Sequence, residues 1–305
     1  MTAQVFIDGE VGTTGLQIRE RLTGRDDITL ISLPEDQRKD ASARRDALAA
    51  ADVAILCLPD DAAREAVTLC QGTDTRLIDA STAHRVDPDW VYGFPEMTAG
   101  QGAAVAGAAR VSNPGCYSTA AIALLRPLRR AGVIGAEAPV SIFGISGYSG
   151  GGKGMIAEFD RGESEGSFIY ATGQGHKHLP EIVRHGLLDN LPIFIPSVGQ
   201  FAQGMVVQIP LHPGMFSGSM NDVHAALAQY YRAGFVSVRP LGDDPARELP
   251  QAVNGTNRLE LSVLGDAATG RVVLSAVLDN LGKGASGAAV QNLNLMLGLP
   301  ADTGL

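Results

Sequence analysis

Short apolar runs alternate with helix-like segments along the first hundred residues, and this order constrains the fold more than any other feature of the chain. The apolar runs predict buried strands at "QVFID" (4–8), "ITLISL" (28–33), "DVAILCLP" (52–59) and "TRLIDAS" (75–81). The segments between them, "TGLQIRERL", "SARRDALAA" and "DAAREAVTLC", carry apolar residues at helical spacing. Strands that alternate with helices are typical of a parallel sheet covered on both faces. We therefore expect an N-terminal α/β domain.

The sequence changes character from about residue 137. Longer β-branched runs follow, separated by glycine and proline: "APVSIFGISGYSG", "LPIFIPSVG", "GMVVQIPL", "NRLELSVLG" and "RVVLSAVLDN". They predict a second, α+β domain on a mostly antiparallel sheet, with one helix in "NDVHAALAQYYRAG". The last segment, "SGAAVQNLNLMLGL", is again helical in periodicity. We expect a first domain over residues 1–115, completed by a C-terminal helix over 286–305, and a second domain over 116–285.

Charge and cysteine content exclude several classes of protein. The net charge is −9 and no cluster of lysine and arginine is present, which argues against a nucleic-acid partner. No run reaches the roughly 18 apolar residues that span a bilayer, and the first residues do not resemble a signal peptide, so we expect a cytoplasmic protein with no membrane partner. Three scattered cysteines without a CxxC pair predict neither a disulfide framework nor a metal site.

A glycine-rich turn, "DGEVGTTGLQI", separates the first predicted strand from the first helix. Glycines there let a tight turn approach a pyrophosphate closely, while the helix N-terminus offers free N–H groups to the anion. A tight turn without a ligand would need the same glycines. The predicted cofactor residues in this turn are Gly9, Gly12, Thr13, Thr14 and Gly15.

The end of the second predicted strand indicates which dinucleotide is preferred. NAD-specific folds usually place an acidic residue there to hold the ribose 2'-hydroxyl. This strand ends instead at Ser32, and the following loop carries Arg38 and Lys39. A hydroxyl with nearby cations suits a 2'-phosphate, so we predict NADP rather than NAD, and Glu35 is the residue that argues the other way.

Cys116 differs in context from the other two cysteines. Cys57 lies inside an apolar strand and Cys70 ends an amphipathic helix, and both are expected to be structural. Cys116, in "VSNPGCYST", follows an Asn-Pro-Gly turn and opens a helix, where N–H groups and the helix dipole lower the pKa of a thiol. The local sequence leaves a nucleophile and a buried thiol equally open.

A cysteine nucleophile needs a proton-transfer partner, and "YATGQGHKHLPEI" offers His176 and His178. Pro180 predicts a helix start that brings Glu181 into the first turn, where it can orient an imidazole. A metal site is the competing interpretation, but HxH alone is a weak signal. Arg85, in "STAHRV" after the fourth strand, is a candidate for an anionic group or else a solvated surface residue.

These segments resemble the N-acetyl-gamma-glutamyl-phosphate reductase family, in its shorter form. The resemblance is carried, in order along the chain, by "DGEVGTTGLQI", "DASTAHRV", "YGFPE", "NPGCYST", "SGYSGGGK", "HKHLPEI" and "DNLGKGASGAAVQNLN". It implies an NADP-binding Rossmann domain followed by an α+β catalytic domain like that of glyceraldehyde-3-phosphate dehydrogenase. It also implies that an acyl phosphate is reduced to an aldehyde in arginine biosynthesis, with Cys116 as nucleophile and His176 and His178 as the histidine motif. Lys177, Leu179 and Gln203 depart from the pattern of the longer relatives.

The resemblance and the residues together define the expected site. Cys116 forms a thioester, and His178, with His176 next, is the expected acid and base. Asn280 and Gly284 are expected to complete the cofactor site, and the expected substrate residues are Arg85, Arg110, Ser146, Ser149, Tyr170 and Gln203. Lys153 is a further cation to test. We expect a homo-oligomer, either a dimer or a tetramer.

Two alternatives stay open at this point. One is an aspartate-semialdehyde dehydrogenase-like reductase of another acyl phosphate, although that family's Asn-Cys-x-Thr context differs from this chain, where Pro114 and Gly115 separate the asparagine from the cysteine. The other is a non-catalytic NADP-binding redox sensor, which would keep the glycine turn without needing Cys116.

Overall fold

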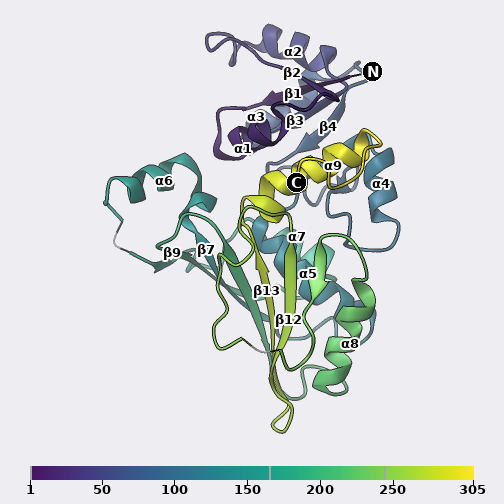
Figure 1. Cartoon of the computed structure of the whole chain (residues 1–305), viewed down its shortest axis with the longest axis vertical. Helices are drawn as coiled ribbons and strands as arrows, with labels where there is room; N and C mark the ends of the chain where they lie inside the picture. Colours follow the sequence, from purple (N-terminus) through teal and green to yellow (C-terminus); the bar gives the residue numbers. More distant parts are fainter. Residues whose placement is uncertain (1, 165, 244) are drawn as a thin grey trace. The chain divides into compact units, whose positions relative to one another are not determined.

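The computed structural model describes residues 2–164, 166–243 and 245–305 and divides the chain into two compact units (Figure 1). The first unit contains the chain up to Gly115 together with Ala285–Leu305. The second unit is Cys116–Gly284. Each unit has its own sheet and is described by itself.

The first unit is the α/β domain that the sequence predicts. Its parallel sheet has the order β2-β1-β3-β4-β6-β5, and its strands are β1 (Ala3–Asp8), β2 (Ile28–Ile31), β3 (Val53–Leu56), β4 (Arg76–Asp79), β5 (Val91–Tyr92) and β6 (Arg110–Ser112). Its helices are α1 (Thr13–Leu22), α2 (Ala41–Ala50), α3 (Asp60–Leu69), α4 (Gln101–Gly107) and α9 (Gly287–Met296). Since β1 lies between β2 and β3, the chain reverses its direction of travel across the sheet at β1. Ligands of such folds bind at this reversal, outside the carboxyl ends of the strands.

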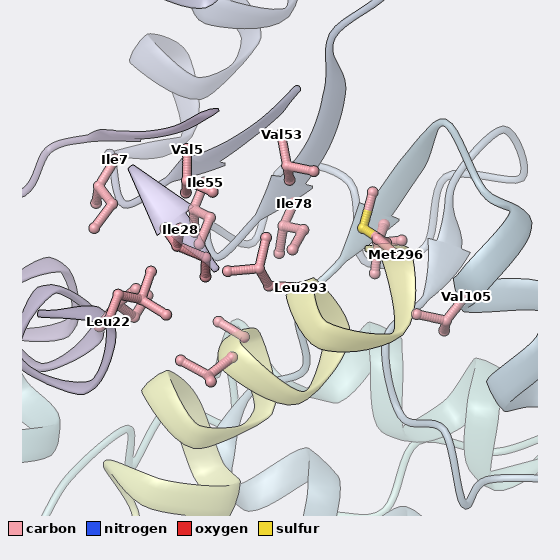
Figure 2. Packing of buried hydrophobic residues seen from close by; sticks show 14 of the residues in the cluster. Val5, Ile7, Leu22, Ile28, Val53, Ile55, Ile78, Val105, Leu293 and Met296 are labelled. Carbon is pink, nitrogen blue, oxygen red and sulfur yellow. The ribbon is translucent and has the colours of Figure 1, made fainter. Parts of the chain in front are cut away.

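Helix α9 completes the hydrophobic core of the first unit. Leu293 and Met296 point from α9 toward Val53, Ile55 and Ile78 of the sheet (Figure 2). A second cluster on the other sheet face packs the apolar side chains of α2 and α3. The closing helix is shorter than the 286–305 segment expected from periodicity.

Two residues explain why α9 ends at Met296. Gly298 adopts the left-handed conformation, with φ at +72°, which stops the helical hydrogen-bond pattern. Pro300 follows and cannot continue a helix.

The second unit is an α+β domain on one mixed sheet. Among the described residues its strands follow the order β11-β12-β13-β10-β7-β9-β8. They are β7 (Ser141–Gly147), β8 (Phe168–Ile169), β9 (Ile193–Gly199), β10 (Met205–Leu211), β11 (Val236–Val238), β12 (Leu259–Asp266) and β13 (Arg271–Leu278). Most neighbouring strands are antiparallel, as predicted, but β7 pairs with β9 and β11 with β12 in parallel.

The helices of the second unit are α5 (Cys116–Arg130), α6 (Gly152–Asp160), α7 (Leu179–Gly186) and α8 (Met220–Tyr230). Helix α5 packs against α7, α8, β10 and β13 and is buried over most of its length (Figure 1). The opposite side of the sheet leaves Phe143, Ile169 and Ile193 exposed. No helix in the described part of the chain is both long and apolar enough to cross a membrane.

Candidate active site

Cys116 is the first residue of α5, as the Asn-Pro-Gly turn predicts. Over residues 111–128 every residue is buried except Cys116, which keeps intermediate exposure. The turn before it is held by Asn113, whose N–H donates to the Asp79 carbonyl (2.7 Å) and whose carbonyl accepts from Arg85 Nε (3.0 Å). The chain therefore presents a partly exposed thiol at a helix N-terminus; Cys57, inside the first unit, is also partly exposed, and Cys70 is buried.

Gly284 packs directly against Cys116, and only a glycine fits there. A Cβ added at Gly284 would lie 2.7 Å from the Cys116 Cβ and 3.2 Å from the Asp279 carbonyl oxygen. The Gly284 N–H also donates to that carbonyl, at 3.0 Å. The side chain of Asp279 is buried and accepts from the N–H groups of Leu281 (2.9 Å) and Gly255 (2.8 Å). Asp279 and Gly284 thus define the space beside the cysteine.

His176 has a defined tautomer in its neutral form. The main-chain N–H of His178 donates to His176 Nδ1 (3.1 Å), so the ring proton lies on Nε2. His176 Nε2 lies 3.4 Å from the Tyr170 hydroxyl, which can accept that proton's hydrogen bond. The His176 and His178 rings meet edge to face, with their centroids 4.7 Å apart.

His178 directly precedes α7, and Pro180 and Glu181 lie in the first turn of that helix, as expected. The residues His178 and Glu181 are 5% and 1% exposed. His178 Nε2 lies 4.0 Å from Glu181 Oε1, close enough for an electrostatic interaction. Glu181 is therefore placed where it can orient the His178 ring, as the sequence predicts.

Two tyrosines surround the histidines. The Tyr117 ring lies edge-on to His176 (centroids 6.2 Å apart), and its hydroxyl donates to the Ser197 carbonyl (2.9 Å). Burial first, and then nearby groups that include the charge of Cys116, raise the pKa of Tyr117. Burial and the charge of Cys116 also raise the pKa of Tyr170. Both hydroxyls therefore stay protonated and can donate hydrogen bonds. We call Cys116, Tyr117, Tyr170, His176 and His178 the cysteine cluster.

Four other expected residues of the second unit, Ser146, Ser149, Gln203 and Asn280, make hydrogen bonds within that unit. Asn280 Oδ1 accepts from the Gly204 N–H (2.8 Å), and its Nδ2 donates to Ser149 Oγ (3.0 Å). Gln203 donates through its side-chain amide to Asp279. Ser146 Oγ donates to the Gly147 carbonyl at 3.1 Å. These contacts hold the loops around 146–149, 203–204 and 279–284 together.

The glycine turn, Gly9–Gly15, has the geometry of a phosphate-binding turn. Gly9 has φ at +89°, and a Cβ there would lie 2.3 Å from the Cys57 carbonyl oxygen. The N-cap of α1 is Gly12, which caps no N–H, and the first turn of α1 contains no acidic residue. Thr13 Oγ1 is buried and has no hydrogen-bond partner among the described residues. An uncapped helix start with an unsatisfied hydroxyl fits the phosphates of a dinucleotide.

Ser32 and Arg38 come together at Glu10. Glu10 Oε2 accepts from Ser32 Oγ (3.2 Å) and from Arg19 Nη1 (2.9 Å). Glu10 Oε1 lies 3.3 Å from Arg38 Nη2. Glu10, Arg19, Ser32 and Arg38 are called the ribose cluster below. Sequence reasoning found Ser32 and Arg38 but missed Glu10 and Arg19, although Glu10 lies inside the quoted turn.

The remaining cations are placed differently from one another. Arg85 is buried and donates to the carbonyls of Asn113 and Ala80, so it supports the turn before Cys116. The Arg110 guanidinium lies over the Trp90 ring, 5.9 Å from its centroid. Lys153 is exposed at the start of α6. In the first unit, burial raises the pKa of Cys57 to about 12, with Asp79 and Asp8 adding to the effect.

Comparison with known proteins gives two family matches. Residues 9–104 match the model "Semialdehyde dehydrogenase, NAD binding domain", and residues 116–280 match "Semialdehyde dehydrogenase, dimerisation domain".

No group of three or more histidine, cysteine or acidic residues in the described ranges could hold a metal ion.

Solved structures of similar fold include aspartate semialdehyde dehydrogenase II of Vibrio cholerae complexed with ASA. It has a TM-score of 0.72 and 16% identity, covering 97% of this chain and 98% of that one. Aspartate semialdehyde dehydrogenase with NADP from Candida albicans has a TM-score of 0.67 and 14% identity, covering both chains fully. Identities this low establish the fold alone.

Much closer sequence relatives are curated as N-acetyl-gamma-glutamyl-phosphate reductases. The protein of Brucella suis is 53% identical over 311 residues, covering 98% of this chain and 100% of the relative. The protein of Brucella anthropi is 53% identical over 309 residues, with 98% and 99% coverage. With both domain models matched as well, the chain belongs to the N-acetyl-gamma-glutamyl-phosphate reductase family.

Proposed function

We propose that this protein reduces N-acetyl-L-glutamyl 5-phosphate to N-acetyl-L-glutamate 5-semialdehyde, with NADPH as reductant and release of phosphate, in arginine biosynthesis. The observation that carries the proposal is the partly exposed thiol of Cys116 at the start of α5, whose charge acts on Tyr170, the tyrosine whose hydroxyl contacts His176. Family membership gives the substrate class. A cytoplasmic location is part of the same proposal.

The first half of the reaction transfers the acyl group to sulfur. The Cys116 thiolate attacks the carbonyl carbon of the acyl phosphate, the C–O bond to phosphate breaks, and inorganic phosphate leaves. A thioester on Cys116 remains. His178 can take the thiol proton, and its contact with the buried Glu181 stabilises the resulting imidazolium.

The second half reduces the thioester. Bound NADPH supplies a hydride, two electrons and one hydrogen nucleus, to the thioester carbon. His178 protonates the oxygen that becomes negative and takes the proton back as the C–S bond breaks, so the aldehyde leaves and the Cys116 thiolate returns. The Tyr170 hydroxyl, held by His176, can donate a hydrogen bond within the same cluster.

The preference for NADPH is proposed from the ribose cluster. Matching of the NAD-binding domain model establishes a dinucleotide domain, but not the choice between its two cofactors. Ser32 is exposed, and it contacts the same carboxylate, Glu10, as two arginine side chains, which supports binding of a 2'-phosphate. The uncapped start of α1 supports pyrophosphate binding.

We also propose a homodimer through the open side of the second unit's sheet. Phe143 and Ile169 are exposed there, and a hollow of about 250 Å³ lies among Phe143, Ile169, Ile195 and Val206. The matched model for this unit is named a dimerisation domain. Ile169→Lys is expected to shift the protein from dimer to monomer in analytical ultracentrifugation, whereas an unchanged mass would contradict this face.

The test of the reaction runs in the oxidative direction. Purified protein is mixed with NADP⁺, phosphate and N-acetyl-L-glutamate 5-semialdehyde, and NADPH absorbance is followed. Cys116→Ala should lower the rate at least about 10³-fold, while Cys70→Ala, at a buried cysteine of the first unit, should not. No signal from intact protein, or faster turnover of aspartate semialdehyde, would overturn the proposed substrate.

A further inference from the structure

We propose that Glu10 limits how strongly the ribose cluster prefers a 2'-phosphate over a 2'-hydroxyl. The inference rests on the proposed cofactor site of the first unit. It concerns a residue that neither the glycine pattern nor the family resemblance singled out.

Glu10 lies beneath the groups that would meet the ribose. The residue is 6% exposed, whereas the side chains of Arg19 and Arg38 are 46% and 34% exposed. Its Oε2 accepts hydrogen bonds from Arg19 and Ser32, and its Oε1 faces Arg38 but accepts no hydrogen bond from any described residue. A buried carboxylate therefore contacts two arginines and one hydroxyl, and these three groups remain open to solvent.

The position of this carboxylate in the fold links it to the cofactor. Ser32 directly follows β2, and the carboxyl end of the second strand is where such folds recognise the ribose 2'-position. NAD-specific folds place an acidic residue at that point. Here the acidic side chain comes from the glycine turn instead, and it is covered by cations. The site thus combines an acceptor typical of NAD with donors typical of NADP.

Two opposing effects of Glu10 can be weighed. Its ion pairs orient Arg19 and Arg38, but pairs between partly exposed side chains contribute little. Its negative charge repels a phosphate dianion held by Ser32 or Arg38. Because both of these residues contact Glu10, the two negative charges would lie within a Debye length of about 8 Å, and salt would screen their repulsion only in part. Repulsion is the larger effect, and Glu10 weakens phosphate binding more than it organises the site.

The experiment measures binding of two cofactor fragments and requires no turnover. Calorimetry at one fixed salt concentration gives Kd for adenosine 2',5'-bisphosphate and for adenosine 5'-monophosphate. Glu10→Gln should lower the Kd of the bisphosphate about tenfold and change the Kd of the monophosphate by less than about twofold. Arg38→Ala should weaken the bisphosphate at least tenfold and spare the monophosphate. Asp74→Asn, at an exposed carboxylate just before the amino end of β4, also removes one negative charge from the first unit and is the matched control that should change neither.

Each outcome bears on one proposal or the other. If Arg38→Ala weakens binding of the bisphosphate but Glu10→Gln does not strengthen it, the role proposed for Glu10 is wrong and the proposed cofactor site stands. If Arg38→Ala does not change binding of the bisphosphate, the ribose cluster is not the 2'-phosphate site. The proposed basis for NADPH preference and the proposed role of Glu10 are then both wrong. Should circular dichroism show that Glu10→Gln is unfolded, Glu10→Met, with a neutral side chain of similar length, should tighten the bisphosphate in its place.

Discussion

The glycine turn with its ribose cluster and the cysteine cluster handle negative charge in opposite ways. The ribose cluster uses permanent charges, two arginines around one buried carboxylate, beside an uncapped helix start. In the cysteine cluster the tyrosine hydroxyls stay protonated, so they are neutral groups that can donate hydrogen bonds to a negative charge. The difference fits the proposed ligands: a cofactor phosphate is always charged, whereas an alkoxide that develops on the substrate would be charged only during a turnover. Fixed cations would trap such transient charge, whereas neutral donors can release it.

The largest expected difference between the two units is in the alkylation rate of their cysteines. Burial and two carboxylates raise the pKa of Cys57 to about 12, so very little thiolate forms near pH 8. Cys57 and Cys116 are both partly exposed, so the fraction of thiolate decides the rate, and Cys116 is expected to react with iodoacetamide about 10³-fold faster than Cys57, as read by peptide mass spectrometry. Labelling of Cys57 should increase with pH over the range in which circular dichroism shows the native fold. Equal labelling of both cysteines in the native protein would contradict the comparison.

Gly284→Ala should damage the cysteine cluster through geometry alone. The added Cβ would lie 2.7 Å from the Cys116 Cβ and must displace it. A misplaced reacting atom commonly costs about 10²-fold, so kcat should fall by that amount while adenosine 2',5'-bisphosphate still binds. Gly135→Ala, whose added Cβ meets no atom within 4 Å, is the control. Normal kcat in Gly284→Ala would show that Cys116 is not tightly positioned.

Tyr170→Phe tests whether a neutral donor assists at the cysteine cluster. The variant keeps the ring but removes the hydroxyl that His176 contacts. We expect kcat to fall about tenfold with KM nearly unchanged, because the lost hydrogen bond acts on charge that develops during the reaction. A rise in KM with normal kcat would instead assign Tyr170 to substrate binding, as its sequence position first indicated.

Salt should affect the two regions to different extents, and this is the smallest expected effect. Raising ionic strength from about 0.05 to 0.5 M screens the partly exposed arginines, so adenosine 2',5'-bisphosphate should bind about fivefold more weakly. Iodoacetamide is uncharged, so the alkylation rate of Cys116 should change less than about twofold. Equal salt sensitivity in both measurements would remove the distinction between fixed and transient charge.

Local patterns predicted the parts of the fold and site that depend on neighbouring residues. The alternation of β1, α1 and β2 is visible in the sequence because short apolar runs alternate with segments whose apolar residues have helical spacing. The Asn-Pro-Gly turn marks the start of α5 because proline and glycine break the strand before it. The roles predicted for Cys116 and the histidines remain predictions, although their side chains do lie in one cluster.

Contacts between distant residues could not be predicted from one sequence. Gln203 donates to Asp279, 76 positions away, and this pairing depends on β10 and β13 being neighbours. Arg85 donates to the main-chain carbonyl of Asn113. No local pattern indicates either contact, and the substrate roles of both residues stay predictions. Arg19 joins the ribose cluster only because α1 turns its side chain back toward Glu10.

The place of α9 has a consequence for how this chain matures on the ribosome. Leu293 and Met296 belong to the core around β1, β3 and β4, yet they are translated after the whole second unit. At about 5–20 residues per second, roughly 180 residues separate β6 from α9, so the early sheet waits on the order of ten seconds or longer for its last apolar layer. During that interval Ile55 and Ile78 lack their final neighbours and are open to chaperones. The nested second unit, continuous in sequence, can complete its own core first.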